Sequence, residues 1–141
     1  MAEEKIRLEL VSPEKLLLTE EVGMVILPGS DGQFGVLAKH IPLVSTLDPG
    51  AIDVYQDGKV DQRIFVSGGF VEVDGERCIV LAEDAMPLDS LEADDVRQEC
   101  RNLKEDLDGA DGEAATILAR RKLDVAEAKL AAVTGESVAT Y

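Results

Sequence analysis

The sequence predicts an all-β N-terminal domain over residues 1–86, a flattened β-sandwich or barrel of short antiparallel strands, followed by an antiparallel α-helical hairpin over residues 87–141. Up to about residue 85, apolar residues alternate with polar ones at a period of two, which is typical of strands with one face inward. Glycine- and aspartate-containing turn signals recur between these stretches. After Pro87 the apolar period changes to 3.6, as in amphipathic helices. The change of period places the domain boundary between residues 86 and 87.

The first strand is predicted from Ile6, Leu8 and Leu10, which alternate with charged residues. Two hairpins have the clearest turns. The segment 52–54 returns through Asp57-Gly58 to 64–66, and the segment 71–73 returns through Asp74-Gly75 to 78–80. At these turns we expect Gly or Asp to supply the positive φ of a tight hairpin.

The continuous apolar runs 24–27 and 79–82 indicate strands that are covered on both faces. Inner strands of two packed sheets have this pattern. The runs therefore favour a sandwich over an open sheet.

The first helix is predicted to begin at a cap formed by Asp89 or Ser90 and to end at Gly109, and the second to run from about Glu113 to Val133 with Gly135 as its stop. The short linker 108–112 predicts an antiparallel hairpin. The residues expected in its seam are Leu91, Val96, Cys100, Leu103, Leu107, Ala115, Ala119, Leu123, Ala126, Leu130 and Val133. Few of them are large, so we expect opening of the hairpin to cost less than unfolding of the β domain.

The composition excludes several classes of function. The 141 residues carry a formal net charge of −15, which argues against binding to nucleic acid. No apolar run approaches the roughly 20 residues that span a bilayer, and the first residues resemble neither a signal nor a transit peptide. Cys78 and Cys100 stand in apolar positions of different elements, which predicts reduced thiols and no metal or redox pair.

No catalytic, metal or cofactor site is indicated by the sequence. Gly29-x-x-Gly32-x-x-Gly35 lacks the Gly-Lys-Ser/Thr of a phosphate loop and is interpreted as turn glycines. His40, the one histidine, has no nucleophile or acid at a triad spacing. We therefore predict a non-catalytic protein that binds other proteins.

The second helix carries the run Arg120, Arg121 and Lys122 within an acidic chain. Two interpretations remain open. The run is either a solvated face or a surface that meets an acidic partner protein.

The segment 27–44, LPGSDGQFGVLAKHIPLV, resembles a signature of the F-type ATP synthase epsilon subunit. The segments 47–50, 66–73 and 80–83 are similar to later landmarks of the family, in the same order. The resemblance extends over nearly the whole chain and agrees with the β-then-helical layout.

The resemblance implies a rotor subunit of the central stalk, which grips the gamma subunit, sits on the c ring and couples proton flow to ATP synthesis. It implies that Asp31 and Gln33 face the polar loops of the c ring, and that His40 lies near the gamma and c-ring contacts. The alternative for each is an ordinary exposed turn residue. With no transit peptide predicted, the expected location is peripheral, on the cytoplasmic side of a bacterial inner membrane, with membrane contact only through the complex.

In many members of the family the helical hairpin detaches, extends along gamma into the alpha/beta catalytic head and blocks hydrolysis. The predicted helices, of about 18 and 21 residues, have lengths of about 27 and 31 Å, which permit this. Arg120, Arg121 and Lys122 would then face the catalytic subunits. Some relatives bind ATP through a hydrophobic-Asp-x-x-Arg-Ala motif, but Asp95 stands where the arginine belongs, and only Asp94-x-x-Arg97 matches in a shifted register. The alternative function is a free regulatory module that senses a ligand such as ATP.

Overall fold

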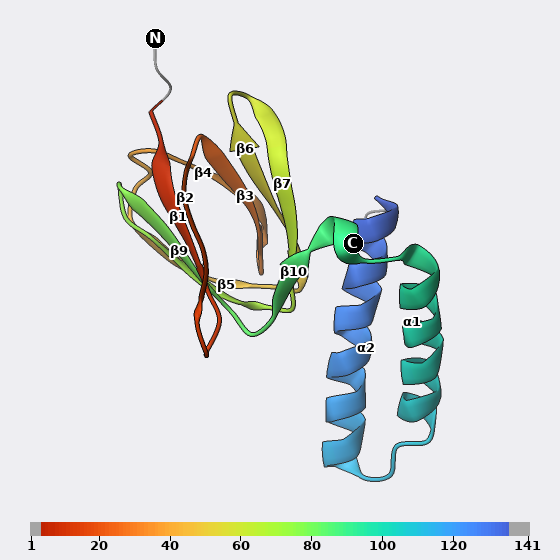
Figure 1. Ribbon diagram of the computed structural model, residues 1–141. Coiled ribbons are helices and arrows are strands. Elements are labelled where there is room, and N and C mark those ends of the chain that lie inside the picture. Colours follow the sequence, from red (N-terminus) through yellow and green to blue (C-terminus); the bar gives the residue numbers. More distant parts are fainter. Residues whose placement is uncertain (1–3, 136–141) are drawn as a thin grey trace. The chain divides into compact units, whose positions relative to one another are not determined.

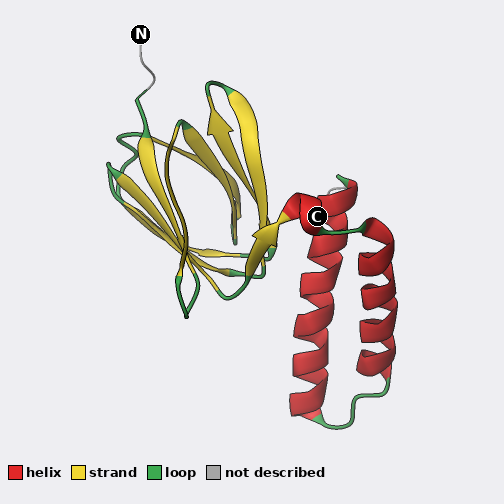
Figure 2. Cartoon of the chain, in the orientation of Figure 1, coloured by secondary structure: helices red, strands yellow, loops and turns green. Residues whose placement is uncertain are grey.

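The computed structural model describes residues 4–135, with strands in the first part of the chain and helices in the second (Figures 1 and 2). The chain divides into two compact units, Met1–Pro87 and Leu88–Tyr141. The expected boundary lies one residue before this division. The predicted fold class, a β domain followed by a helical hairpin, is confirmed.

Within the described part of the first unit, residues 4–87, ten strands form one curled sheet. Their order is β10-β7-β6-β3-β5-β8-β9-β1-β2, and β4 pairs with β3 outside this path. Their bounds are β1 Ile6–Val11, β2 Leu16–Val22, β3 Met24–Gly29, β4 Gly32–Leu37, β5 Leu43–Leu47, β6 Gly50–Gln56, β7 Lys59–Val66, β8 Gly69–Val73, β9 Arg77–Ala82 and β10 Ala85–Pro87.

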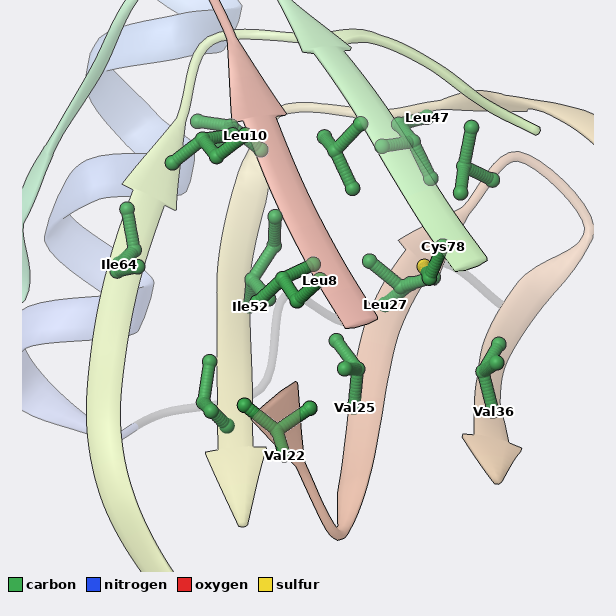
Figure 3. Packing of buried hydrophobic residues seen from close by; sticks show 14 of the residues in the cluster. Leu8, Leu10, Val22, Val25, Leu27, Val36, Leu47, Ile52, Ile64 and Cys78 are labelled. Carbon is green, nitrogen blue, oxygen red and sulfur yellow. The ribbon is translucent and has the colours of Figure 1, made fainter. Parts of the chain in front are cut away.

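The inward side chains of the curled sheet make one hydrophobic core (Figure 3). Ile6, Leu8 and Leu10 are all buried, as the period of two predicts. They meet residues from strands distant in sequence, such as Ile52 of β6 and Cys78 of β9. Among residues 4–135 no polar or charged residue is buried, so apolar burial is the main stabilising contribution to this unit.

One strand pairing departs from the antiparallel prediction. β1 pairs with β2 in the antiparallel sense and with β9 in the parallel sense, so that Leu8 lies beside Cys78. About 70 residues separate these partners in the chain, and local turn signals carry no information on such a pairing.

The two clearest hairpins form as predicted, but their turns differ. Asp57 and Gly58 have φ values of 53° and 78°, which agrees with the expected positive φ and with a two-residue primed turn. At Asp74-Gly75 the prediction of a positive φ is wrong. There Asp74 Oδ1 accepts hydrogen bonds from the backbone N–H groups of Glu76 at 2.9 Å and Arg77 at 2.8 Å, so the side chain stabilises the turn.

The prediction that runs 24–27 and 79–82 are covered on both faces is wrong for their outward residues. Val25, Leu27, Val80 and Ala82 are buried, but Met24, Ile26 and Ile79 are half-buried and Leu81 is exposed. The sheet curls around a single core, so its outer face lacks the second layer that was expected from these runs.

In the second unit, residues 88–135 are described and contain two α-helices. A short 3₁₀ helix, Leu88–Ser90, precedes α1, Ala93–Asp108, and α2 is Glu113–Thr134. The predicted cap at Asp89 or Ser90 is wrong because the 3₁₀ turn occupies these positions, and Glu92 is the N-cap without a side-chain cap bond. Gly109 caps α1, and Gly135 ends α2 at a left-handed φ of 76°, both as predicted.

The helices form a hairpin with few buried residues. Val96, Leu123 and Ala126 are buried, whereas Ala115, which was expected in the seam, is exposed. The remaining seam residues, Leu91, Cys100, Leu103, Leu107, Ala119, Leu130 and Val133, are half-buried. α1 and α2 also share an ion pair between Lys129 Nζ and Glu99 Oε1 at 3.5 Å.

Candidate functional site

A row of four apolar residues and one threonine crosses the outer face of five neighbouring strands. Thr46 of β5 pairs with Phe70 of β8, Phe70 with Leu81 of β9, Leu81 with Val11 of β1, and Val11 with Leu16 of β2. In β5, β8, β9 and β1 a neighbouring residue along the strand is inward and buried, so the row faces outward there, and in β2 both Leu16 and Leu17 are exposed. We call these five residues the outer apolar row.

The row is accessible to a partner. Phe70 is 43%, Leu81 36% and Leu16 57% exposed. Val44, two residues before Thr46 and therefore on the same face of β5, is 69% exposed. Along the strands the same face becomes charged, with Glu72 and then Arg77. An exposed apolar stripe bordered by charges is typical of a protein interaction site.

The turn that holds Asp31 adjoins one end of this row. Ser30 donates its backbone N–H to Thr46 O at 3.2 Å, and the two hydroxyl groups of Ser30 and Thr46 also share a hydrogen bond. Gly29 is required there, because a Cβ would lie 2.7 Å from the Phe34 ring. Asp31 and Gln33 are both exposed on this braced turn.

His40 lies at the opposite end of β4. Six residues of β4 separate the turn from the loop after Leu37, a length of about 17 Å between the first and last Cα atoms. The His40 ring is half-buried, and its Nδ1 lies 2.7 Å from Ile41 O. A carbonyl oxygen only accepts, so Nδ1 carries the proton. The structure brings Asp31 and Gln33 together and separates His40 from them.

Arg120, Arg121 and Lys122 are exposed on α2 and form no ion pair with any residue in the range 4–135. Consecutive residues of a helix point about 100° apart, so the three cations fan around the helix and do not form one face. Either open interpretation of this run is compatible with these positions.

A family model for "ATP synthase, Delta/Epsilon chain, beta-sandwich domain" matches residues 5–88, more than half of the chain. This chain belongs to the ATP synthase epsilon family. The epsilon chain of Paramagnetospirillum magneticum is 48% identical over 130 residues, which cover 92% of this chain and 98% of that one. The epsilon chain of Rhodospirillum rubrum is 48% identical over 132 residues, covering 94% and 98%.

Solved structures agree with the family. A chain in the OSCP/F1/c-ring structure of the Euglena gracilis mitochondrial ATP synthase superimposes with a TM-score of 0.80 at 26% identity, covering 92% of this chain and 81% of that chain. A chain in the central stalk/c-ring structure of the Tetrahymena thermophila enzyme has a TM-score of 0.62 at 16% identity, covering 94% and 99%, and supports the fold alone. The predicted family is therefore confirmed.

The nucleotide motif known from some epsilon subunits remains incomplete here. Asp95 is exposed at the position of the arginine, and the guanidinium of Arg97 is paired with Asp94, Nη1 to Oδ1 at 3.0 Å. Both partners are exposed and the pair is weak, but a carboxylate beside this arginine disfavours phosphate.

The two thiols of this chain, Cys78 and Cys100, are free in the structure. Burial raises the pKa of Cys78 to about 12. The pKa of Cys100 is also raised, first by burial and then by the carboxylates of Glu127 and Glu99. Among residues 4–135 there is no group of three or more potential metal ligands, and none of the helices there has the length and hydropathy to cross a membrane.

Sequence reasoning missed the outer apolar row. Of its residues only Leu81 belongs to one of the continuous apolar runs, and that run was interpreted as an inner strand of two packed sheets. The strand order, which places Phe70, Leu81 and Val11 side by side, is needed to recognise the row.

Proposed function

We propose that this chain is the non-catalytic epsilon subunit of a bacterial ATP synthase rotor, which holds gamma through the outer apolar row and couples it to the c ring. Family membership and the exposed row carry this proposal. A stable interface commonly buries about 800 Å² per partner around an apolar centre, and the row supplies such a centre.

Within this proposal the braced turn with Asp31 and Gln33 contacts the polar loops of the c ring, because it is exposed and held by hydrogen bonds between Ser30 and Thr46. His40 lies at the other end of β4. A flat surface of the c ring that contacts the turn would not reach it, so we assign His40 to the contact with gamma. The protein is then peripheral, on the cytoplasmic face of the inner membrane, and contacts the membrane only through the complex.

The row is tested with Phe70→Asp. A charge at a buried interface position costs about 2 kcal/mol or more, so the affinity for gamma should fall at least about 30-fold. Val60→Asp is the matched control, because Val60 is similarly exposed at 46% but lies on β7, outside the row. Binding is measured with purified gamma by titration calorimetry. Equal affinities of the two variants would refute the row as the gamma site.

We further propose that the hairpin inhibits ATP hydrolysis when its two helices open and extend along gamma into the catalytic head. The small number of buried residues in α1 and α2 supports easy opening of the hairpin. Ile117 and Leu118, each 52% exposed, offer apolar contacts in the part of α2 next to the turn between the helices. Arg120, Arg121 and Lys122 would face acidic surfaces of the catalytic head.

Replacing these three cations with Ala should weaken inhibition by the complex, and the effect should shrink at high salt. Ala retains helix propensity and the exposed charges contribute little to the hairpin, so helicity by circular dichroism should be unchanged. Parent and triple mutant that inhibit equally at low salt would identify the run as a solvated face.

The alternative of a free ATP sensor is tested separately. Because Asp94 occupies Arg97, titration of the isolated protein with Mg-ATP should show no binding below about millimolar. Micromolar affinity that is lost in Arg97→Gln would favour the sensor.

A further inference from the structure

An open cavity of about 1000 Å³ lies in the β unit, at the end of the sheet where His40 is found. Seven of the 14 lysines and arginines belong to residues 1–87, and four of those seven, Lys5, Arg7, Lys39 and Arg77, line this cavity. Glu4, Glu21 and Glu76 line it as well. The lining is thus locally cationic in a chain of net charge −15. We call Lys5, Arg7, Lys39 and Arg77 the cationic cluster.

Strand register brings two of these cations together. Arg7 of β1 and Arg77 of β9 are direct partners in the parallel pair, and neighbouring strands lie about 4.8 Å apart. Like charges directly opposite each other are unfavourable. Glu21 is the partner of Arg7 on the other side, yet neither guanidinium forms an ion pair with any residue of the described range 4–135. Both guanidinium groups line the same cavity, and neither is held by a carboxylate of the described residues.

The third cation is held in place by its backbone. Lys39 has a φ of 64°, an uncommon conformation for a residue with a Cβ, and its N–H donates to Gly75 O at 2.9 Å. This bond joins the loop after β4 to the turn between β8 and β9. The Lys39 ammonium contacts Glu4 at 3.1 Å, but both side chains are exposed, and an anion in the cavity can replace this partner.

The chemistry of the lining selects among anions. Two guanidinium forks and two ammonium groups match the oxygens of a phosphate better than a single carboxylate. Among residues 4–135 no Phe or Tyr side chain lines the cavity, and His40 supplies the one aromatic ring there, so the lining offers mainly cationic groups and few surfaces for a nucleobase. We propose that the cationic cluster binds a phosphate-bearing anion of at least two charges, either a free polyphosphate or a lipid phosphomonoester headgroup.

The test uses the full chain and inorganic triphosphate. Titration should shift the backbone amide resonances of Lys5, Arg7, Lys39 and Arg77, and the thermal midpoint should rise with triphosphate concentration as expected for a ligand of the folded state. In R7Q/R77Q the affinity should fall at least tenfold. The control K15Q/K59Q changes the net charge equally at two positions outside the cavity. Because Arg7 and Arg77 are exposed, both double variants should remain folded, as circular dichroism would verify.

A parallel arm measures sedimentation with vesicles that contain phosphatidic acid in phosphatidylcholine. Triphosphate binding that depends on Arg7 and Arg77 assigns the cavity to a free polyphosphate. Vesicle binding with the same dependence and no response to triphosphate assigns it to the headgroup. No binding in either arm, or equal weakening in R7Q/R77Q and K15Q/K59Q, would overturn the proposal, since general charge screening would then account for the data.

Discussion

Leu123→Ala tests whether the helical hairpin opens independently of the β unit. Leu123 is 2% exposed and is the largest buried side chain of α2. A buried Leu→Ala change costs about 2–5 kcal/mol, through lost apolar burial and the cavity that remains. In α1 and α2 only Val96 and Ala126 are buried besides Leu123, so the free energy lost in Leu123→Ala is a large share of the stability of the hairpin.

The assay is amide hydrogen exchange of the full chain. In Leu123→Ala, exchange of the α1 and α2 amides should accelerate about 30-fold or more, while exchange of the buried strands β1, β8 and β9 should stay unchanged. Ile117→Ala, at an exposed position of the same helix, is the control and should have little effect. Equal acceleration in the helices and the strands would refute independent opening, because the two units would then unfold as one.

Three further predictions concern the β unit. Gly69→Ala should destabilise the protein by several degrees in thermal midpoint, because Gly69 has a φ of 145° and a Cβ would overlap the Leu81 carbonyl oxygen; an unchanged midpoint would contradict this geometry. Hydrogen bonds from the Glu76 and Arg77 N–H groups lower the pKa of Asp74 from 3.8. The ionised carboxylate should therefore contribute to the stability of the fold above pH 3.8, and this contribution should disappear as the pH falls through the pKa of the folded state. Asp74→Ala should therefore lower the midpoint at pH 6 but not at the acid limit, and a constant difference would refute the assignment. Deletion of residues 88–141 should leave a folded β unit that still binds gamma, and loss of binding would contradict the proposed division of roles.

Much of the fold was predictable from local patterns. The alternation at Ile6, Leu8 and Leu10 identified a half-buried strand, Asp57-Gly58 identified a hairpin, and Gly135 identified the end of the second helix. Each of these signals acts within a few residues, because side-chain period and turn conformation are local properties of the backbone.

The sequence by itself determined the fold class, a β domain followed by a helical hairpin, and, through the segment 27–44, the family. Tertiary structure decided which strands became neighbours. It placed β1 beside β9, and so joined Phe70, Leu81 and Val11 into one exposed row and Arg7 and Arg77 into one cationic pair. These sites depend on register between strands about 70 residues apart, which is set by the curling of the sheet around its core and is not encoded by any local pattern.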